Sequence, residues 1–152
     1  MPSQLYLTIM STNNELLEKA LRIAVEAHAG QVDKSGKPYI FHPLRVCCRC
    51  FTDEEKMVAL LHDTIEDTEI TAEDLLSEGF PPYIVEAILS ISRNEDETYE
   101  EFVKRTSLNP LGRAVKLHDL EDNMDISRLE QVTEKDFDRL NKYIKAYRYL
   151  KG

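Results

Sequence analysis

The chain has 152 residues, of which 42% are hydrophobic, and it carries a formal net charge of −9. This length suits one domain with a substantial core, so we expect a single domain over residues 1–152. The acidic balance disfavours nucleic-acid binding, and the sequence holds no apolar run long enough for a membrane span. The N-terminus does not resemble a secretory signal, so we expect a cytoplasmic protein.

Apolar residues at helical spacing predict an all-α fold with about seven or eight helices. The first helix is expected over residues 13–29, with Ser11 or Thr12 as its cap. Glu15 would complete a capping box with Thr12. A loop is expected over residues 31–41, because this segment combines a Ser-Gly turn with a proline.

Proline and threonine mark the starts of the later helices. Pro43 is expected at the first position of a second helix, where its fixed φ angle is favourable. A third helix is expected over residues 53–62, with Asp53 as its cap. The remaining helices are expected at residues 72–78 after Thr71, at 82–92, from Thr98, from Pro110 and at 134–150. The last of these is amphipathic and would pack on its own core or on another subunit, so the oligomeric state stays open.

Three cysteines, Cys47, Cys48 and Cys50, lie within four residues. Their number is odd and their spacing is too short for a disulfide framework. We interpret them as small hydrophobic residues of a helix. A thiolate metal site is the alternative, although the usual spacing of two separated cysteine pairs is absent.

The stretch LLHDTIEDT, residues 60–68, places four ionisable groups at the end of an apolar segment. Glu66 follows His62 by four residues and Asp67 follows Asp63 by four, so each pair shares a face if the helix continues. Adjacent His62 and Asp63 can meet one ion only if the chain turns there. Taken alone, this stretch is typical of a solvated helix end.

Two further residues strengthen a functional interpretation. His42 follows the apolar residues of YIFHP, and Asp119 ends the apolar run of AVKLHDL. Imidazole together with carboxylate groups suits Mn²⁺, Fe²⁺ or Zn²⁺. The sequence therefore predicts a metal site that does not need the cysteines.

Three runs together resemble a known family: HAGQVDKSGKPYIFHP, LLHDTIEDT and VKLHDLEDNM. Their order and spacing resemble the HD-domain hydrolases of the RelA/SpoT type, over roughly residues 18–129. The resemblance implies an all-α HD-domain fold. It also implies a metal-dependent phosphohydrolase that uses Mn²⁺, or another divalent transition metal, to remove pyrophosphate from the 3′ position of a ppGpp-like nucleotide.

Matched position by position, the resemblance implies four metal ligands: His42, His62, Asp63 and Asp119. Glu66 and Asp67 match the acidic pair beside the attacking water, as the catalytic residues. The resemblance also implies three residues that line the nucleotide pocket: Lys34, Ser35 and Asn123. His28 matches a family histidine outside the metal shell, and we interpret it as structural.

The chain departs from the family on the substrate side. Asp33, Leu120 and Asp125 stand where the family commonly has basic residues. His118 stands where the family usually has alanine, and we interpret it as peripheral. Cationic contacts to phosphate are expected from residues near the motifs: Lys34, Lys37, Lys116 and Arg128.

Two alternatives to a ppGpp-like substrate stay open. One is hydrolysis of another nucleotide or of a phosphorylated cofactor such as NADPH. The other is a binding module that senses a nucleotide without hydrolysing it. The intact set of predicted ligands and acids argues against the second alternative.

Overall fold

The computed structural model describes the backbone of residues 4–152 and the side chains of residues 12–152. Within this range the chain forms nine α-helices and a short 3-10 helix, and it forms no strand apart from an isolated bridge between Val32 and Pro38. The α-helices are α1 (Gln4–Ala27), α2 (Phe41–Arg49), α3 (Asp53–Leu61), α4 (Thr64–Asp67), α5 (Ala72–Ser77), α6 (Pro82–Ser90), α7 (Tyr99–Ser107), α8 (Pro110–Asn123) and α9 (Glu134–Lys151). The 3-10 helix η1 spans Ile126–Arg128.

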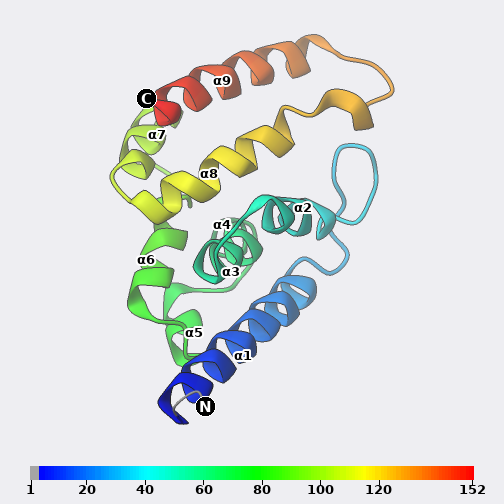
Figure 1. Cartoon of the computed structure of the whole chain (residues 1–152). Coiled ribbons are helices and arrows are strands. Elements are labelled where there is room, and N and C mark those ends of the chain that lie inside the picture. Colours follow the sequence, from blue (N-terminus) through cyan, green and yellow to red (C-terminus); the bar gives the residue numbers. More distant parts are fainter. Residues whose placement is uncertain (1–3) are drawn as a thin grey trace.

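Helix α3 lies at the centre of the fold, between α1 on one side and α8 on the other (Figure 1). Its residues Met57 to Leu61 are all buried, and α2 and α6 also pack against it. A second, smaller apolar cluster joins α7, α8 and α9 through Val103, Leu120, Ala146 and Leu150. The all-α prediction is confirmed. All eight expected helices are present, and the additional one is the single turn α4.

The threonine caps predicted from the sequence are confirmed at two helices. Thr71 and Thr98 each accept a hydrogen bond from the backbone of the third helical residue, and a carboxylate completes each capping box. At α3 the prediction was off by one residue. Thr52 is the cap, and its hydroxyl accepts from the Glu55 amide, while Asp53 is the first helical residue. A threonine before an aspartate competes for the same role.

Two helices begin earlier than predicted. Helix α1 starts at Gln4, so the predicted cap Thr12 and the proposed box with Glu15 lie inside the helix. The side chain of Ser11, the other predicted cap, lies outside the described side chains. Helix α2 starts at Phe41, which places Pro43 at its third position. Proline is tolerated there, because the first four amides of a helix have no partner within the helix.

Only some of the apolar residues of helix α9 are buried against the rest of the protein. Ala146 and Leu150 are buried, whereas Phe137 is 60% exposed and Ile144 is 42% exposed, although both belong to the expected apolar face. Within residues 4–152, no helix is both long enough and apolar enough to cross a membrane.

Gly112 brings α8 close to α6. A Cβ atom placed on Gly112 would lie 1.9 Å from Ser90 Oγ and 3.2 Å from the Ala87 carbonyl oxygen. We therefore expect Gly112→Ala to lower the free energy of unfolding by about 1–3 kcal/mol, since the helices must separate. Urea unfolding measures this change. The cost should shrink in a Ser90→Ala background, and an equal cost in both backgrounds would contradict the assigned contact.

Candidate metal centre and adjoining pocket

The turn between α3 and α4 sets the direction of two predicted ligands. Helix α3 ends at Leu61, and Asp63, with φ −100° and ψ 0°, precedes α4. Because the chain turns here, the adjacent side chains converge, with His62 Nε2 3.0 Å from Asp63 Oδ2. Leu60 and Leu61 are buried in the core, which anchors the end of α3.

Ligands from three helices meet at one point inside the fold. His42 from α2, His62 directly after α3 and Asp119 from α8 offer donor atoms that all lie within 4.8 Å of one another. Asp119 Oδ1 lies 2.9 Å from His42 Nε2 and 3.3 Å from His62 Nε2. All three side chains are buried. Buried imidazole and carboxylate groups that converge in this way form the donor set of a divalent-metal site.

Asp63, the fourth predicted ligand, lies close both to these three ligands and to a second group of carboxylates. Its Oδ2 atom lies 3.7 Å from His42 Nε2, and it also accepts a hydrogen bond from the Tyr39 hydroxyl. Asp63, Glu66 and Asp67 form a further group whose oxygens lie within 4.8 Å of one another. The structure therefore brings the four predicted ligands and the two predicted catalytic acids to the same place.

His62 provides a test of whether these residues fit a metal ion. Its Nδ1 atom is 2.6 Å from the Ala59 carbonyl oxygen, to which it can donate, and this tautomer leaves Nε2 as an acceptor. His62 Nε2 is buried and has no hydrogen-bond partner, although two carboxylates lie near it. A buried ring nitrogen without a partner is costly in a protein interior. Coordination of a metal ion at this atom would remove that cost.

Lys116 supports Asp119 from the other side. Its ammonium lies 2.7 Å from Asp119 Oδ2, and both groups are buried. Burial opposes ionisation of Asp119, but Lys116 and the two histidines hold its pKa well below the usual range. The Asn123 amide also donates to Asp119 Oδ1, at 3.1 Å. Lys116, predicted as a cationic contact to phosphate, is instead paired with Asp119 in the structure and does not line the adjoining cavity.

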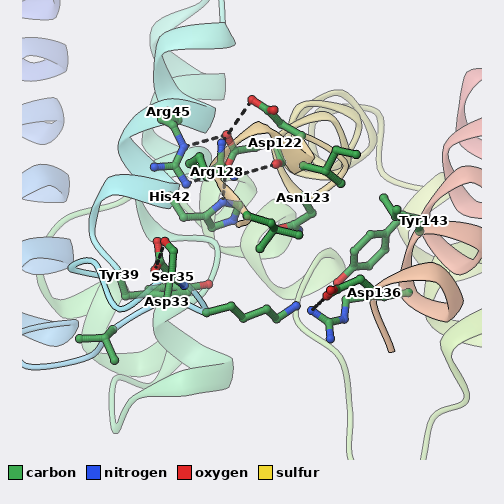
Figure 2. Close-up of a pocket in the computed structure, with 17 residues that line it drawn as sticks. Asp33, Ser35, Tyr39, His42, Arg45, Asp122, Asn123, Arg128, Asp136 and Tyr143 are labelled. Atoms are coloured by element: carbon green, nitrogen blue, oxygen red, sulfur yellow. Dashed lines mark hydrogen bonds and ion pairs between the residues drawn. The ribbon is translucent and has the colours of Figure 1, made fainter. Parts of the chain in front are cut away.

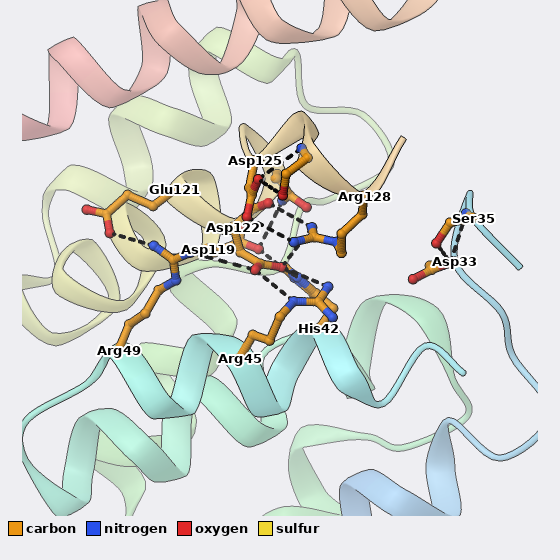
Figure 3. Close-up of polar contacts among 12 residues, drawn as sticks. Asp33, Ser35, His42, Arg45, Arg49, Asp119, Glu121, Asp122, Asp125 and Arg128 are labelled. Atoms are coloured by element: carbon orange, nitrogen blue, oxygen red, sulfur yellow. Dashed lines mark hydrogen bonds and ion pairs between the residues drawn. The ribbon is translucent and has the colours of Figure 1, made fainter. Parts of the chain in front are cut away.

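Asp122 holds the other ring nitrogen of His42. Its Oδ2 atom lies 2.7 Å from His42 Nδ1, and its carboxylate accepts two hydrogen bonds from Arg45, at 2.9 and 3.1 Å (Figure 3). Arg128 approaches the same carboxylate at 3.6 Å. Burial opposes the charge on Asp122, but His42 and Arg45 lower its pKa. A carboxylate on the outer nitrogen of a ligating histidine fixes the ring and its tautomer.

Glu66 and Asp67 lie at the exposed edge of the centre. The backbone N–H of Arg93 donates to Glu66 Oε1 at 3.0 Å, which fixes this carboxylate. Partial burial raises the pKa of Glu66, and the charges of Asp63 and Asp67 raise it further. The pKa of Asp67 is raised for the same two reasons, burial first and then Asp63. Such carboxylates are stronger bases than free ones.

A cavity of about 290 Å³ adjoins the metal cluster and is lined by the predicted residues Lys34, Ser35 and Asn123 (Figure 2). It lies between the loop after α1, the start of α2, the end of α8 and the start of α9. Residues that the sequence reasoning did not single out for it also line it: Arg45, Asp122, Arg139 and Tyr143. Tyr39 lines the cavity as well.

Asp33 and Asp125, which stand where the family commonly has basic residues, both have hydrogen-bond partners within the protein. Asp33 accepts hydrogen bonds from the backbone and hydroxyl of Ser35, and Asp125 accepts the same pair from Ser127. Asp125 also pairs with Arg128 at 3.3 Å. Leu120, at the third such position, is fully buried in the α7–α8–α9 cluster and does not line the cavity. These replacements therefore remove positive charge from the substrate side, and both carboxylates have hydrogen-bond partners within the protein.

The remaining predicted residues lie outside this centre. His28 is buried, and its Nδ1 atom is 2.8 Å from Gln31 Oε1, which agrees with a structural role. Lys37 does not line the cavity. His118 points toward a different cluster, together with Cys50 and Glu55. Cys48 is exposed and Cys47 is half-buried, so only Cys50 has the buried position expected for all three.

Comparison with known proteins places the chain in a family. No protein-family model matches it. The chain is 34% identical over 122 residues to a guanosine-3′,5′-bis(diphosphate) 3′-pyrophosphohydrolase of Aquifex aeolicus, which covers 72% of this chain and 17% of that protein. It is 40% identical over 81 residues to the bifunctional (p)ppGpp synthase/hydrolase SpoT of Escherichia coli, covering 51% of this chain and 11% of that protein. The chain thus spans less than a fifth of the length of these relatives.

A solved structure of a metazoan SpoT orthologue that hydrolyses ppGpp has a similar fold, with a TM-score of 0.72 and 21% sequence identity. The match covers all of this chain and 88% of that one. The helical fold and its buried His/Asp cluster define an all-α domain of the HD-like class. Together with the sequence similarities, they show that the chain belongs to the RelA/SpoT type.

Proposed function

We propose that this chain is a metal-dependent phosphohydrolase that removes pyrophosphate from the 3′ position of a (p)ppGpp-like nucleotide. The metal would be Mn²⁺, held by His42, His62, Asp63 and Asp119. The observation that carries the proposal is the buried group of two imidazoles and two carboxylates, whose donor atoms converge beside a cavity of about 290 Å³. The names of the relatives support the substrate class.

When bound, the metal ion would acidify a water molecule and polarise a phosphoryl oxygen. Glu66 is the residue we assign as the base that accepts the proton of this water. Its carboxylate is fixed by the Arg93 amide, and burial raises its pKa, which makes it a stronger base than a free glutamate. Asp67 would share this role or orient the water.

The cavity supplies the groups for a phosphorylated nucleotide. Lys34, Arg45, Arg128 and Arg139 line it and carry positive charge, while Tyr39 and Tyr143 offer aromatic surfaces. Arginine binds phosphate through two parallel N–H donors, and an aromatic ring stacks on a base. Four acidic residues also line the cavity, and an arginine lies within 4 Å of each of three of them, which offsets part of their charge: Asp122, Asp125 and Asp136. Asp33 keeps its negative charge beside the ligand position.

A panel of substrates tests the proposal. Purified protein loaded with Mn²⁺ should release pyrophosphate from ppGpp. Release of phosphate from NADPH or from another nucleotide, but not from ppGpp, would favour the alternative phosphohydrolase. Tight binding of nucleotides without any product would favour the sensing module. We further propose that the chain acts as one domain and in the cytoplasm.

Asp122→Asn is expected to weaken Mn²⁺ binding by about 10–100-fold, because it removes the charge that orients His42. Isothermal titration with Mn²⁺ measures the change, and excess Mn²⁺ should restore most of the hydrolysis. Asp138→Asn, at an exposed acid of α9, is the control. Equal Mn²⁺ affinity in the two variants would contradict the role of Asp122.

A further inference from the structure

Three metal-binding side chains of different kinds meet outside the centre described above. They are the thiol of Cys50, the carboxylate of Glu55 and the imidazole of His118, and their donor atoms all lie within 4.8 Å of one another. Cys50 follows the last residue of α2, Glu55 belongs to the first turn of α3, and His118 belongs to α8. Eight residues separate Cys50 from His42, which is about 12 Å along a helix.

Each of the three side chains forms one polar contact with a neighbouring group. Each also keeps a lone pair of electrons with which to bind a metal ion. Cys50 is 6% exposed, forms no disulfide, and its thiol donates to the Val46 carbonyl at 3.3 Å. Glu55 Oε2 accepts from the Phe51 amide at 3.4 Å. His118 Nδ1 lies 3.5 Å from Glu121 Oε2.

This pattern is typical of metal sites. A ligating histidine commonly gives its other ring nitrogen to a carboxylate, and a ligating carboxylate is itself hydrogen-bonded. With Glu121 on Nδ1, the Nε2 atom of His118 is the nitrogen left for a metal ion.

We propose that Cys50, Glu55 and His118 bind a Zn²⁺ ion at a second metal site. One sulfur, one nitrogen and one oxygen donor match the ligands of zinc, whereas a soft thiolate ligand disfavours Mg²⁺ and Mn²⁺. Three protein ligands leave the fourth tetrahedral position for water. Binding replaces the thiol proton with the metal, so each Zn²⁺ bound releases one proton from Cys50 to the solvent.

The position of this site suggests its role. It connects the end of α2 to α3 and α8. Helices α2 and α8 carry His42 and Asp119, and His62 directly follows α3. Zinc bound here would therefore hold together the frame of the first centre and stabilise the fold. The site does not depend on the proposed function, because it uses none of the residues assigned to hydrolysis.

Cobalt(II) in place of zinc tests the proposal, because a thiolate ligand gives Co²⁺ a charge-transfer absorption band and the first centre contains no sulfur. Full-length protein stripped of metal with a chelator has two sites to fill with Co²⁺, the first centre and the second site. The thiolate band should therefore develop within the addition of two equivalents of Co²⁺, and excess Zn²⁺ should abolish it. Cys50→Ser should lack the band, and His118→Ala should bind Co²⁺ at least tenfold more weakly. Cys48→Ser, which changes an exposed thiol of the same segment, should behave as the unchanged chain.

Thermal unfolding gives a second readout that does not require a coloured complex. Zn²⁺ should raise the Tm of the unchanged chain and of Cys48→Ser by more than that of His118→Ala, because the first centre accepts Zn²⁺ in all three and only the second site is lost in His118→Ala, which alters a half-buried residue. Absence of the thiolate band in the unchanged chain would overturn the proposal. Its persistence in Cys50→Ser, or its loss in Cys48→Ser, would overturn the assigned ligand.

Discussion

Asp63→Asn is expected to abolish tight binding of the divalent metal ion at the first centre and, with it, hydrolysis. Asparagine keeps the shape of the side chain and can still accept the hydrogen bond from the Tyr39 hydroxyl, so the fold should be retained. It loses the negative charge that faces His62 at 3.0 Å and His42 at 3.7 Å. The loss of Mn²⁺ affinity should exceed the roughly 10–100-fold that follows from removing only a partner of a ligand.

Metal analysis of purified protein and titration with Mn²⁺ measure this effect. Asp96→Asn, at an exposed acid in the segment before α7, is the control and should keep the metal. Thermal unfolding of both variants separates a lost ligand from a lost fold. If Asp63→Asn retains both the metal and the activity, the assigned ligand set is wrong.

Glu66→Gln is expected to keep the metal ion and to lower kcat by about 10²–10⁴-fold, the usual contribution of a positioned general base. Glutamine still accepts the hydrogen bond from the Arg93 amide, so the side chain should keep its place. It cannot accept a proton from water. Steady-state kinetics at saturating Mn²⁺ measure the effect, and Glu69→Gln, three residues further along and exposed, is the control.

The pH dependence of kcat gives an independent check on Glu66. A base must be deprotonated to act, so activity falls as the pH drops through its pKa. The charge of Asp67 raises the pKa of Glu66, and Asp67→Asn should therefore shift the acid limb of the profile to lower pH. Unchanged kcat in Glu66→Gln would transfer the role of the base to Asp67.

The helices could be predicted well because their signals are local. Thr71 and Thr98, each followed three residues later by an acidic residue, marked the starts of α5 and α7 correctly. The start of α1 was misplaced because no glycine or proline interrupts residues 4–12, and the polar residues Thr12 and Asn13 resemble a cap. The single turn α4 is too short to show a period of its own.

The candidate centre was predictable where the ligand residues stand at the ends of apolar runs. His62 and Asp119 are of this kind, and the separate helices that carry them do meet. Asp122 and Arg45 could not be identified in this way. Each resembles a charge on a solvated helix face, and only the packing of α2 against α8 buries the Asp122 carboxylate beside His42.

The substrate side was the least predictable part. The replacement of a basic residue by Asp33 or Asp125 appears as a reversal of charge in the sequence. In the structure each carboxylate stabilises its own turn, because it accepts a hydrogen bond from the hydroxyl of a serine two residues later. Leu120 follows a predicted ligand in the sequence, yet it points into the apolar cluster because successive helical residues are rotated by about 100°.

Release of pyrophosphate from ppGpp by the Mn²⁺-loaded protein tests the central claim most directly. We predict pyrophosphate and GDP as products in equal amounts, with release stopped by a metal chelator and absent in Asp63→Asn. A protein that binds Mn²⁺ at the His/Asp centre but releases neither phosphate nor pyrophosphate from ppGpp or from any other nucleotide would contradict it.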